Sequence, residues 1–456
     1  MTPLPEEDPV ERLLDLLRTE NDDALRVFLE DFPHASDIAD LLEELDEDDR
    51  VRLVRVIAAD PALAAETLAE MEPEEHPEDS LAALESDQLA AVVAEMSDDD
   101  AADLIGEMDK EDQDRVLAAL SHEDAGDIRE LMRYPEDSAG GIMTTELVAV
   151  AIDLTAAEAI EEVRRQAQEV EQLYVVFAVD GSGILRGFLP LASLVSAAPS
   201  AMVVDLIEEV PATVFPETDR EEVARIVSRY NVTVVGVVDA GGRLLGGVTF
   251  DDVLDVLEEE NTRDILGLGG TSQGEELRGG WADAVRSRLP WLYLNLVTAF
   301  AAASVVYAFQ DVVEQVALLA VCMPVIAGLG GNTGTQALAV TVRRLALSQN
   351  NNQRSWTVLR KEILVGATNG LATGVVAATA AYFLAVNTGG SPMLAVVVLL
   401  AMWVNLAVGG FAGAFVPTVL ERFGIDPAIA SSIFVTTFTD TFGFFLLLGL
   451  ASQILL

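Results

Sequence analysis

Residues 324–336 read PVIAGLGGNTGTQ, which sets a proline, four glycines and two amides inside an apolar segment long enough to cross a membrane. Lipid-facing helices rarely have this composition, because backbone disturbed by Pro and Gly must be buried in protein or line water. Asn332 and Gln336 are four residues apart and share one helix face. We predict a broken helix whose freed carbonyls meet a hydrated ion beside Asn332. The alternative is that the glycines, including Gly328 and Gly331, form a small-residue face on which helices pack.

Four other segments are also apolar and long enough to span a membrane. The five predicted spans are about 289–309, 315–342, 360–386, 393–420 and 429–455. With the amino terminus inside, all eight basic residues around the spans fall on the cytoplasmic side: Arg286, Arg288, Arg343, Arg344, Arg354, Arg360, Lys361 and Arg422. Because five helices are few to enclose a pore within one chain, we expect a homodimer in the lipid bilayer with a shared axial pore.

The fifth span contains TTFTDTFG at residues 436–443, and Asp440 is the only carboxylate in the interior of any predicted span. An Asp at that depth costs about 2.5–3.5 kcal/mol on insertion scales, so it normally faces a cavity or a functional partner. A salt bridge or a bond to the threonines is the structural alternative, although no basic residue shares that depth. In a dimer, two copies of Asp440 form an acidic ring suited to hydrated Mg²⁺. Thr436 and Gly443 are further pore candidates.

The charge is divided very unevenly along the chain. Residues 1–280 hold 69 Asp and Glu against 19 Lys and Arg, whereas residues 281–456 hold 7 against 8. A field this negative opposes binding to nucleic acid. The single cysteine, Cys322, gives no support to an oxidising compartment. The acidic residues 6–8 replace the basic start of a secretory signal, so we expect a multi-pass plasma-membrane protein with cytoplasmic amino-terminal domains.

The soluble part divides into a repetitive helical region and a duplicated region. Residues 1–137 are helical in pattern, with Ser97, Asp109 and Ser121 at 12-residue spacing as helix N-caps in a small superhelix. Residues 138–257 contain two copies of a helix, a strand pair and another helix, which resemble a tandem pair of CBS domains. In the second copy, Thr249 and Asp252 look like the turn that contacts ribose and phosphate in nucleotide-binding CBS pairs; a purely structural turn is the alternative.

The remaining boundaries complete a multidomain α plus α/β protein with a polytopic α-helical membrane domain. An acidic helix from 251 to about 270 joins the CBS pair to the first span, so residues 258–280 are read as a connecting helix and linker and 281–456 as the membrane domain. Position alone makes this helix the candidate transmission element. An inert amphipathic linker would satisfy the same pattern.

Taken together, YPEDSAGGIMT at 134–144, the CBS pair, GGNTGTQ at 330–336 and the Thr-Asp of the last span resemble the MgtE family of magnesium channels or transporters. The resemblance covers essentially the whole chain. It implies a homodimer whose cytosolic domains close a central pore when internal Mg²⁺ is plentiful. It also implies that Asp440 is the selectivity carboxylate, that Asn332 helps hold the hydrated ion, that the connecting helix is a plug, and that ATP binds the CBS pair.

Mg²⁺ closes such a pore only if it binds the compact state more tightly, so its ligands must lie between domains. The candidate ligands are acidic residues on the predicted facing surfaces: Asp99, Asp100, Asp103, Asp137, Asp252, Asp255, Glu258, Glu259 and Asp426. Arg263 stands before Asp264 where the family usually has an acidic pair, which puts one bridging site in doubt. The general excess of acid suggests a salty cytosol, in which an acidic surface stays hydrated.

Three other functions remain open. A transporter of Co²⁺, Ni²⁺ or Mn²⁺ is the closest competitor, although a site of oxygen ligands without nearby Cys or His favours a hard ion. A non-transporting receptor that uses the CBS pair needs neither Asp440 nor the glycine-rich run. A membrane hydrolase has no legible P-loop, metalloprotease or Ser-His-Asp pattern, and we expect no enzymatic activity.

Overall fold

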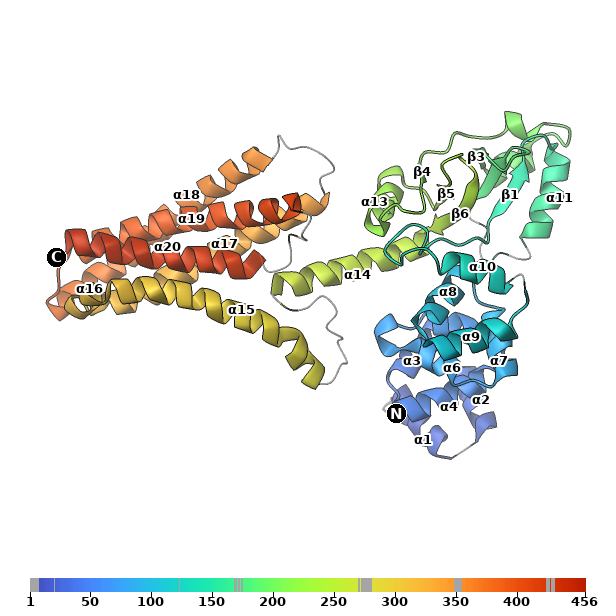
Figure 1. The fold of residues 1–456 in the computed structure, drawn as a ribbon, viewed down its shortest axis with the longest axis horizontal. Coiled ribbons are helices and arrows are strands. Elements are labelled where there is room, and N and C mark those ends of the chain that lie inside the picture. The colour runs from blue at the N-terminus through green and yellow to red at the C-terminus, as the bar shows by residue number, and fades with distance from the viewer. Residues whose placement is uncertain are drawn as a thin grey trace, which may run out of the picture. The chain divides into compact units, whose positions relative to one another are not determined.

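The computed structural model describes residues 8–19, 21–122, 124–167, 170, 173, 175–269, 271, 281–347, 355–423, 427 and 431–456 (Figure 1). The chain divides into two compact units, Met1–Glu259 and Glu260–Leu456. The first unit contains most of the acidic residues, and the second contains the apolar segments.

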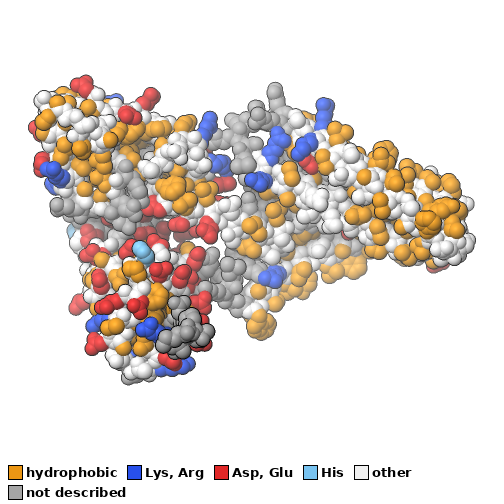
Figure 2. Space-filling view, turned by 180° about the vertical axis from the view of Figure 1, so that it is seen from behind, with side chains coloured by type: hydrophobic (Ala, Val, Ile, Leu, Met, Phe, Trp, Pro, Cys, Tyr) orange, Lys and Arg blue, Asp and Glu red, His pale blue; other side chains and the backbone are white. Residues whose placement is uncertain are grey.

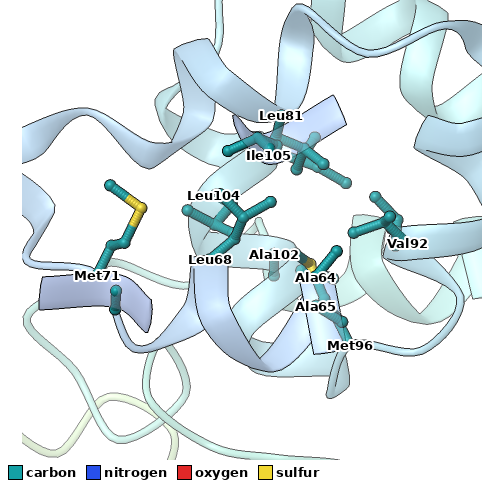
Figure 3. Close-up of a cluster of buried hydrophobic side chains, with 14 of the residues drawn as sticks. Ala64, Ala65, Leu68, Met71, Leu81, Val92, Met96, Ala102, Leu104 and Ile105 are labelled. Atoms are coloured by element: carbon teal, nitrogen blue, oxygen red, sulfur yellow. The ribbon is translucent and has the colours of Figure 1, made fainter. Parts of the chain in front are cut away.

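Ten short α-helices are described in the amino-terminal part of the first unit. They are α1 (Pro9–Arg18), α2 (Asp22–Leu29), α3 (Ala35–Glu43), α4 (Glu47–Ile57), α5 (Pro61–Ala69), α6 (Pro77–Ala82), α7 (Ser86–Val93), α8 (Asp98–Glu107), α9 (Lys110–Ala119) and α10 (Asp124–Leu131), with a 3-10 turn at Pro73–Glu75. Figure 3 shows Leu68, Leu81, Val92 and Ile105, from α5 to α8, gathered in the shared core. Burial of these apolar faces holds each short helix in place.

The three predicted N-caps are confirmed at the starts of the last three helices. Ser97 accepts a hydrogen bond from the first turn of α8, and Asp109 accepts two from the first turn of α9. Asp124 N donates to Ser121 Oγ at 3.2 Å at the start of α10. Each cap satisfies amides that a helix end leaves without a partner, so the 12-residue recurrence reports helix starts.

The rest of the first unit is a duplicated α/β fold, as the sequence predicts. The first copy has β1 (Val148–Ala151), α11 (Ala156–Gln166), β2 (Val176–Val179), β3 (Leu185–Leu189) and α12 (Leu191–Ser196); the second, after a 3-10 turn at Val203–Asp205, has β4 (Thr213–Val214), α13 (Arg220–Tyr230), β5 (Val234–Val238), β6 (Leu244–Thr249) and α14 (Phe250–Gly269). In both sheets the first strand is parallel to the second, which is antiparallel to the third.

The second copy shares its core with the helical region, whereas the first copy has a core of its own. Val223, Val235 and Val253 belong to the same buried cluster as the leucines of α1 to α8. The segment after Tyr134 joins the two parts, because Gly140 N donates to Pro216 O at 2.9 Å. A Cβ at Gly141 would lie 2.3 Å from the Pro135 carbonyl oxygen, so this close turn requires glycine.

The second unit is a bundle of long helices in its described part: α15 (Trp281–Ala308), α17 (Leu318–Leu347), α18 (Ser355–Thr388), α19 (Leu394–Arg422) and α20 (Ser431–Ile454), with a short α16 (Gln310–Gln315) before α17. All five long helices are apolar enough to cross a membrane, which confirms the five predicted spans. Figure 2 shows that the Lys and Arg side chains of this apolar unit gather at one end. This is the asymmetry that the positive-inside rule describes.

Helix α19 is the centre of this bundle. Half of its most apolar 18-residue window is buried, against 6% for α15. Glycines on α18 permit the close contact with α19: a Cβ at Gly366 would lie 2.3 Å from the Leu406 carbonyl oxygen, and one at Gly370 would lie 2.8 Å from that of Trp403. These two glycines allow the backbones to approach, as small residues do in membrane bundles.

Candidate functional site

The glycine-rich segment is an unbroken helix, so the predicted break in the second span is wrong. Helix α17 is continuous from Leu318 to Leu347, with Pro324 inside it. The Leu329 and Gly331 carbonyl oxygens accept hydrogen bonds from the Thr333 and Thr335 hydroxyls at 3.0 and 3.1 Å. Carbonyls freed for an ion beside Asn332 are therefore not observed in this helix. The amides and hydroxyls of the side chains remain as the polar groups of this segment.

Packing explains why some of these glycines are present. A Cβ at Gly334 would lie 2.4 Å from Val435 Cγ1 of α20, and one at Gly413 of α19 would lie 2.3 Å from the Gly334 carbonyl oxygen. At Gly334 the structure therefore has the small-residue packing face that was the alternative prediction. Gly328 is different, because a Cβ there would have no neighbour within 4 Å.

Helices α17 and α20 bring the two principal pore candidates to one level of the bundle. A Cβ at Gly331 would lie 3.8 Å from Thr436 Cγ2 and 4.0 Å from Thr439 Oγ1. Asn332 and Asp440 are the next residues in the two helices, so they lie within about one helical turn of the same level. Asn332 is exposed on the surface of the single chain, and Asp440 is half-buried.

Asp440 makes no hydrogen bond or ion pair with any residue in the described part of the chain. The surrounding threonines donate to backbone carbonyls instead: Thr436 to Ser432 O at 2.9 Å and Thr437 to Ile433 O at 2.7 Å. The structural alternative of a threonine-bonded carboxylate is therefore not observed. A carboxylate at membrane depth without a protein partner is available to an ion or to water.

The exposed surface of α17 around Asn332 is polar. Gly328, Asn332, Thr335 and Gln336 are all exposed in the single chain. Gly443 of α20 is buried, because a Cβ there would lie 2.8 Å from Asn405 Nδ2. Gly443 therefore makes room for the Asn405 side chain. The exposed α17 residues form the polar surface.

Asn405 is a residue that the sequence reasoning missed. It is fully buried in α19, and its Nδ2 donates to the Ile326 carbonyl oxygen at 3.0 Å. Its Oδ1 has no hydrogen-bond partner among the described residues. A Cβ at Gly330 would lie 2.3 Å from Nδ2, so glycines on both neighbouring helices surround this amide. The one sequence signal was an isolated amide in the most hydrophobic of the five spans.

The predicted regulatory acids gather where α8 faces the start of α14, within the first unit. Asp99 is only 8% exposed, and its Oδ1 has no hydrogen-bond partner among the described residues. Desolvation, followed by the charges of Asp252 and Asp100, raises the pKa of Asp99 well above its ordinary value. A buried carboxylate oxygen without a donor, with like charges beside it, is a favourable ligand for a cation.

Desolvation and nearby negative charges also raise the pKa values of carboxylates close to Asp99. Desolvation and then the charges of Asp100, Glu136 and Asp252 raise the pKa of Asp103 to about 7, against an opposing effect of Arg220. Desolvation also raises the pKa values of Asp252 and Asp255, each to about 6. The bare cluster is therefore electrostatically unfavourable when all its members are ionised.

The remaining acidic candidates are distributed less tightly. Glu259 forms an ion pair with Arg220, and Asp255 feels the charges of Glu258 and Glu259. Asp137 is exposed, and its backbone carbonyl accepts from Arg220 N at 3.0 Å. Asp426 lies outside the described residues. In the part of the chain that the structure describes, no group of three or more His, Cys, Asp or Glu side chains is arranged to hold a metal ion directly.

The predicted nucleotide turn is built as a helix cap. The Thr249 hydroxyl donates to Asp252 Oδ2, and Thr249 N donates to the same oxygen at 3.2 Å. Asp252 is thus shared between this turn and the acids of α8. This arrangement matches the alternative of a purely structural turn. The Thr249 hydroxyl oxygen can still accept a hydrogen bond.

The predicted acidic helix from 251 to about 270 is confirmed as α14, which ends at Gly269. Arg263 pairs with Glu260 at 2.6 Å along the same helix, which explains how a basic residue is accommodated there. In the second unit, Leu268 packs against Leu338 and Val342 of α17. The side chain of Asp264 lies outside the described residues.

Comparison with known proteins agrees with this architecture. Family models match residues 323–450 (MgtE, divalent cation transporter), 33–137 (MgtE intracellular N domain), and 139–200 and 203–259 (CBS domain). The magnesium transporter MgtE of Thermus thermophilus is 35% identical over 437 residues, which cover 95% of each chain. That of Enterococcus faecalis is 34% identical over 72% of each chain. The cytosolic domain of the Mg²⁺ channel MgtE in complex with ATP matches at 36% identity with a TM-score of 0.50, covering 54% of this chain and 99% of that one.

Proposed function

The chain belongs to the MgtE family, and from this premise we propose that it is a Mg²⁺-selective channel or transporter that admits the ion to the cytoplasm. The observation that carries the proposal is Asp440, a membrane-depth carboxylate without a protein partner among the described residues, level with Asn332. Two copies of this surface, facing one another in a homodimer, would line a pore with carboxylates and amides. Oxygen ligands of this kind suit a divalent ion that keeps its water.

The side chains have distinct roles in this pore. Asp440 attracts and holds the hydrated cation, with Asn332 and Gln336 as hydrogen-bonding partners of its water shell. Gly328 keeps the surface of α17 open because it has no side chain. Gly331 and Thr436 meet where α17 contacts α20 beside the ion, and Gly443 makes room on α20 for Asn405 of α19. Asp440 thereby contributes charge selectivity, and the water shell contributes the preference for a small divalent ion.

Closure by internal Mg²⁺ is the second part of the proposal. Asp99, Asp100, Asp103 and Asp252 repel one another when bare, so a hydrated Mg²⁺ among them would favour the compact first unit. Asp255, Glu258 and Glu259 continue this acidic surface along α14, and Asp137 and Asp426 are the outlying candidates. Helix α14 then transmits the change to the pore domain as a plug.

The rest of the proposal concerns the domain boundaries, nucleotide binding and the cellular location of the protein. We assign 1–137 to the N domain, 138–257 to the CBS pair, 258–280 to the plug and linker, and 281–456 to the pore domain. ATP would bind the CBS pair near Thr249, by analogy with the 36% identical cytosolic domain that was solved in complex with ATP. The basic end of the membrane unit would face the cytoplasm in the plasma membrane.

Ion flux into proteoliposomes tests the function. The natural chain should admit Mg²⁺, and Asp440→Asn should reduce flux by at least tenfold because the only charge at that depth is removed. Asp311→Asn is the matched control, since Asp311 is an exposed carboxylate on the short helix α16. Co²⁺, Ni²⁺ and Mn²⁺ measured in parallel distinguish the competing transporters. Absence of flux in correctly oriented natural protein would favour the receptor.

A further inference from the structure

A cavity of about 220 Å³ lies at membrane depth among α17, α18 and α19. Thr333 and Gln336 of α17, Glu362 and Asn369 of α18 and Gly410 of α19 are among its lining residues. At about 30 Å³ for each water, the volume holds on the order of seven water molecules. This is enough for a cation with a complete first hydration shell.

Glu362 is the unusual member of this lining. Its residue is 5% exposed, and its Oε1 has no hydrogen-bond partner among the described residues. The neighbouring charge is Lys361 Nζ at 3.2 Å from Oε1, on a side chain that is 60% exposed. A carboxylate buried within a membrane span is costly unless its charge is compensated, and one exposed lysine compensates it only in part.

The backbone holds Glu362 in this position. A Cβ at Gly410 would lie 2.3 Å from the Glu362 carbonyl oxygen, so α18 contacts α19 directly at this residue. Asn369 lies about two helical turns further along α18 and extends the polar lining away from Lys361. The cavity therefore continues from the basic end of the bundle toward the level of Thr333, which adjoins Asn332.

We propose that this cavity is a second cation site, in which Glu362 holds a hydrated divalent cation between Asp440 and the cytoplasmic surface. The inference rests on the proposed function for its physiological ion, Mg²⁺. The lining offers a carboxylate, two amides and a hydroxyl, whose oxygens are hard ligands and partners for coordinated water, and it also includes the exposed ammonium of Lys361. Because the buried charge is negative and the lysine is exposed, the lining favours a cation over an anionic lipid headgroup.

Cysteine accessibility in the full-length protein tests the site without relying on flux. Cys322, the single cysteine, is replaced by Ser, and Val365→Cys in the cavity is compared with Val376→Cys on the same helix outside it. A water-soluble cationic methanethiosulfonate should modify Val365→Cys at least tenfold faster. Mg²⁺ should slow this reaction several-fold, and Glu362→Gln, of nearly the same shape, should abolish the protection. Equal modification at the two positions, or protection that survives Glu362→Gln, would overturn the proposal.

Further variants distinguish failure of the second cation site from failure of the proposed transport function. Asn369→Leu should weaken the protection and serves as the second test should Glu362→Gln not yield a monodisperse protein. Asp440→Asn should reduce flux by at least tenfold and leave the protection unchanged, because Asp440 does not line the cavity. Flux without protection would refute the second site alone, and protection without flux would refute only the proposed function. Protection by anionic lipid instead of Mg²⁺, lost in Lys361→Gln, would identify a headgroup and refute the cation site.

Discussion

Desolvation and then charge repulsion at single carboxylates make the stability of the first unit dependent on pH. The pKa of an unfolded Asp is about 3.9, whereas the pKa of Asp103 is about 7 and that of Asp252 about 6 in the folded chain. A raised folded-state pKa contributes stability that is present below the unfolded value and is lost as pH rises through the folded value. The Mg²⁺-free soluble region should therefore melt at a lower temperature at about pH 8 than at about pH 5.5.

Asp103→Asn should reduce this difference by a few degrees, because it removes one of the repelling charges; the side chain keeps contact with solvent, so the effect is limited by screening. Glu107→Gln, the same charge change on the same helix, is the control. Differential scanning calorimetry at both pH values measures the shift. If both variants changed the melting-temperature difference between the two pH values equally, general surface charge, and not this cluster, would set the pH dependence of stability.

Some candidate pore residues were predictable because their signal is local. Asp440 stands out as a charge within an apolar span, and its lack of a partner follows from the absence of basic residues at that depth. Asn405 and Glu362 were missed because their significance depends on burial against other helices. Glu362 lies near the end of its span, where a charge is normally solvated, and its burial depends on the packing of α18 against α19.

At the scale of the helix, α17 shows why composition predicted a break that does not occur. Pro and Gly weaken an isolated helix, but packing against neighbouring helices decides membrane structure. Gly334 contacts α19 and α20 so closely that larger residues would not fit. Those partners follow much later in the sequence, so a local pattern could not identify them. The five spans were predictable, since hydropathy and length are properties of each segment alone.

The two kinds of glycine in α17 should respond differently to substitution. A Cβ at Gly330 would lie 2.3 Å from Asn405 Nδ2, so Gly330→Ala should destabilise the bundle by about 1–3 kcal/mol, seen as a lower melting temperature in detergent. Gly328→Ala, with no neighbour within 4 Å, should not lower the melting temperature, because alanine also favours the helix over glycine. Asn405→Ala should relieve part of the Gly330→Ala defect, because it removes the clashing amide. Strictly additive effects would contradict this contact.

At the scale of the molecule, the division of charge gives two separate reasons for the soluble part to expand in pure water. Residues 1–280 carry a net charge of −50, while the cluster of α8 and α14 concentrates repulsion at one contact. Salt screens the general repulsion, since the Debye length falls to about 3 Å at 1 M. A divalent cation bound between carboxylates acts on the local cluster at far lower concentration.

Residues 1–259 should therefore lose structure and expand as KCl is lowered from molar to millimolar, because an acidic surface adapted to a salty cytosol loses its screening ions. Circular dichroism and small-angle X-ray scattering measure the two changes. Millimolar Mg²⁺ should restore compactness more than KCl of equal ionic strength, and the double variant Asp99→Asn with Asp252→Asn should lose only that excess. Unchanged spectra across the salt range would refute the salty-cytosol hypothesis. An Mg²⁺ effect equal to that of KCl would instead refute specific bridging, because screening depends on ionic strength whereas bridging depends on paired ligands.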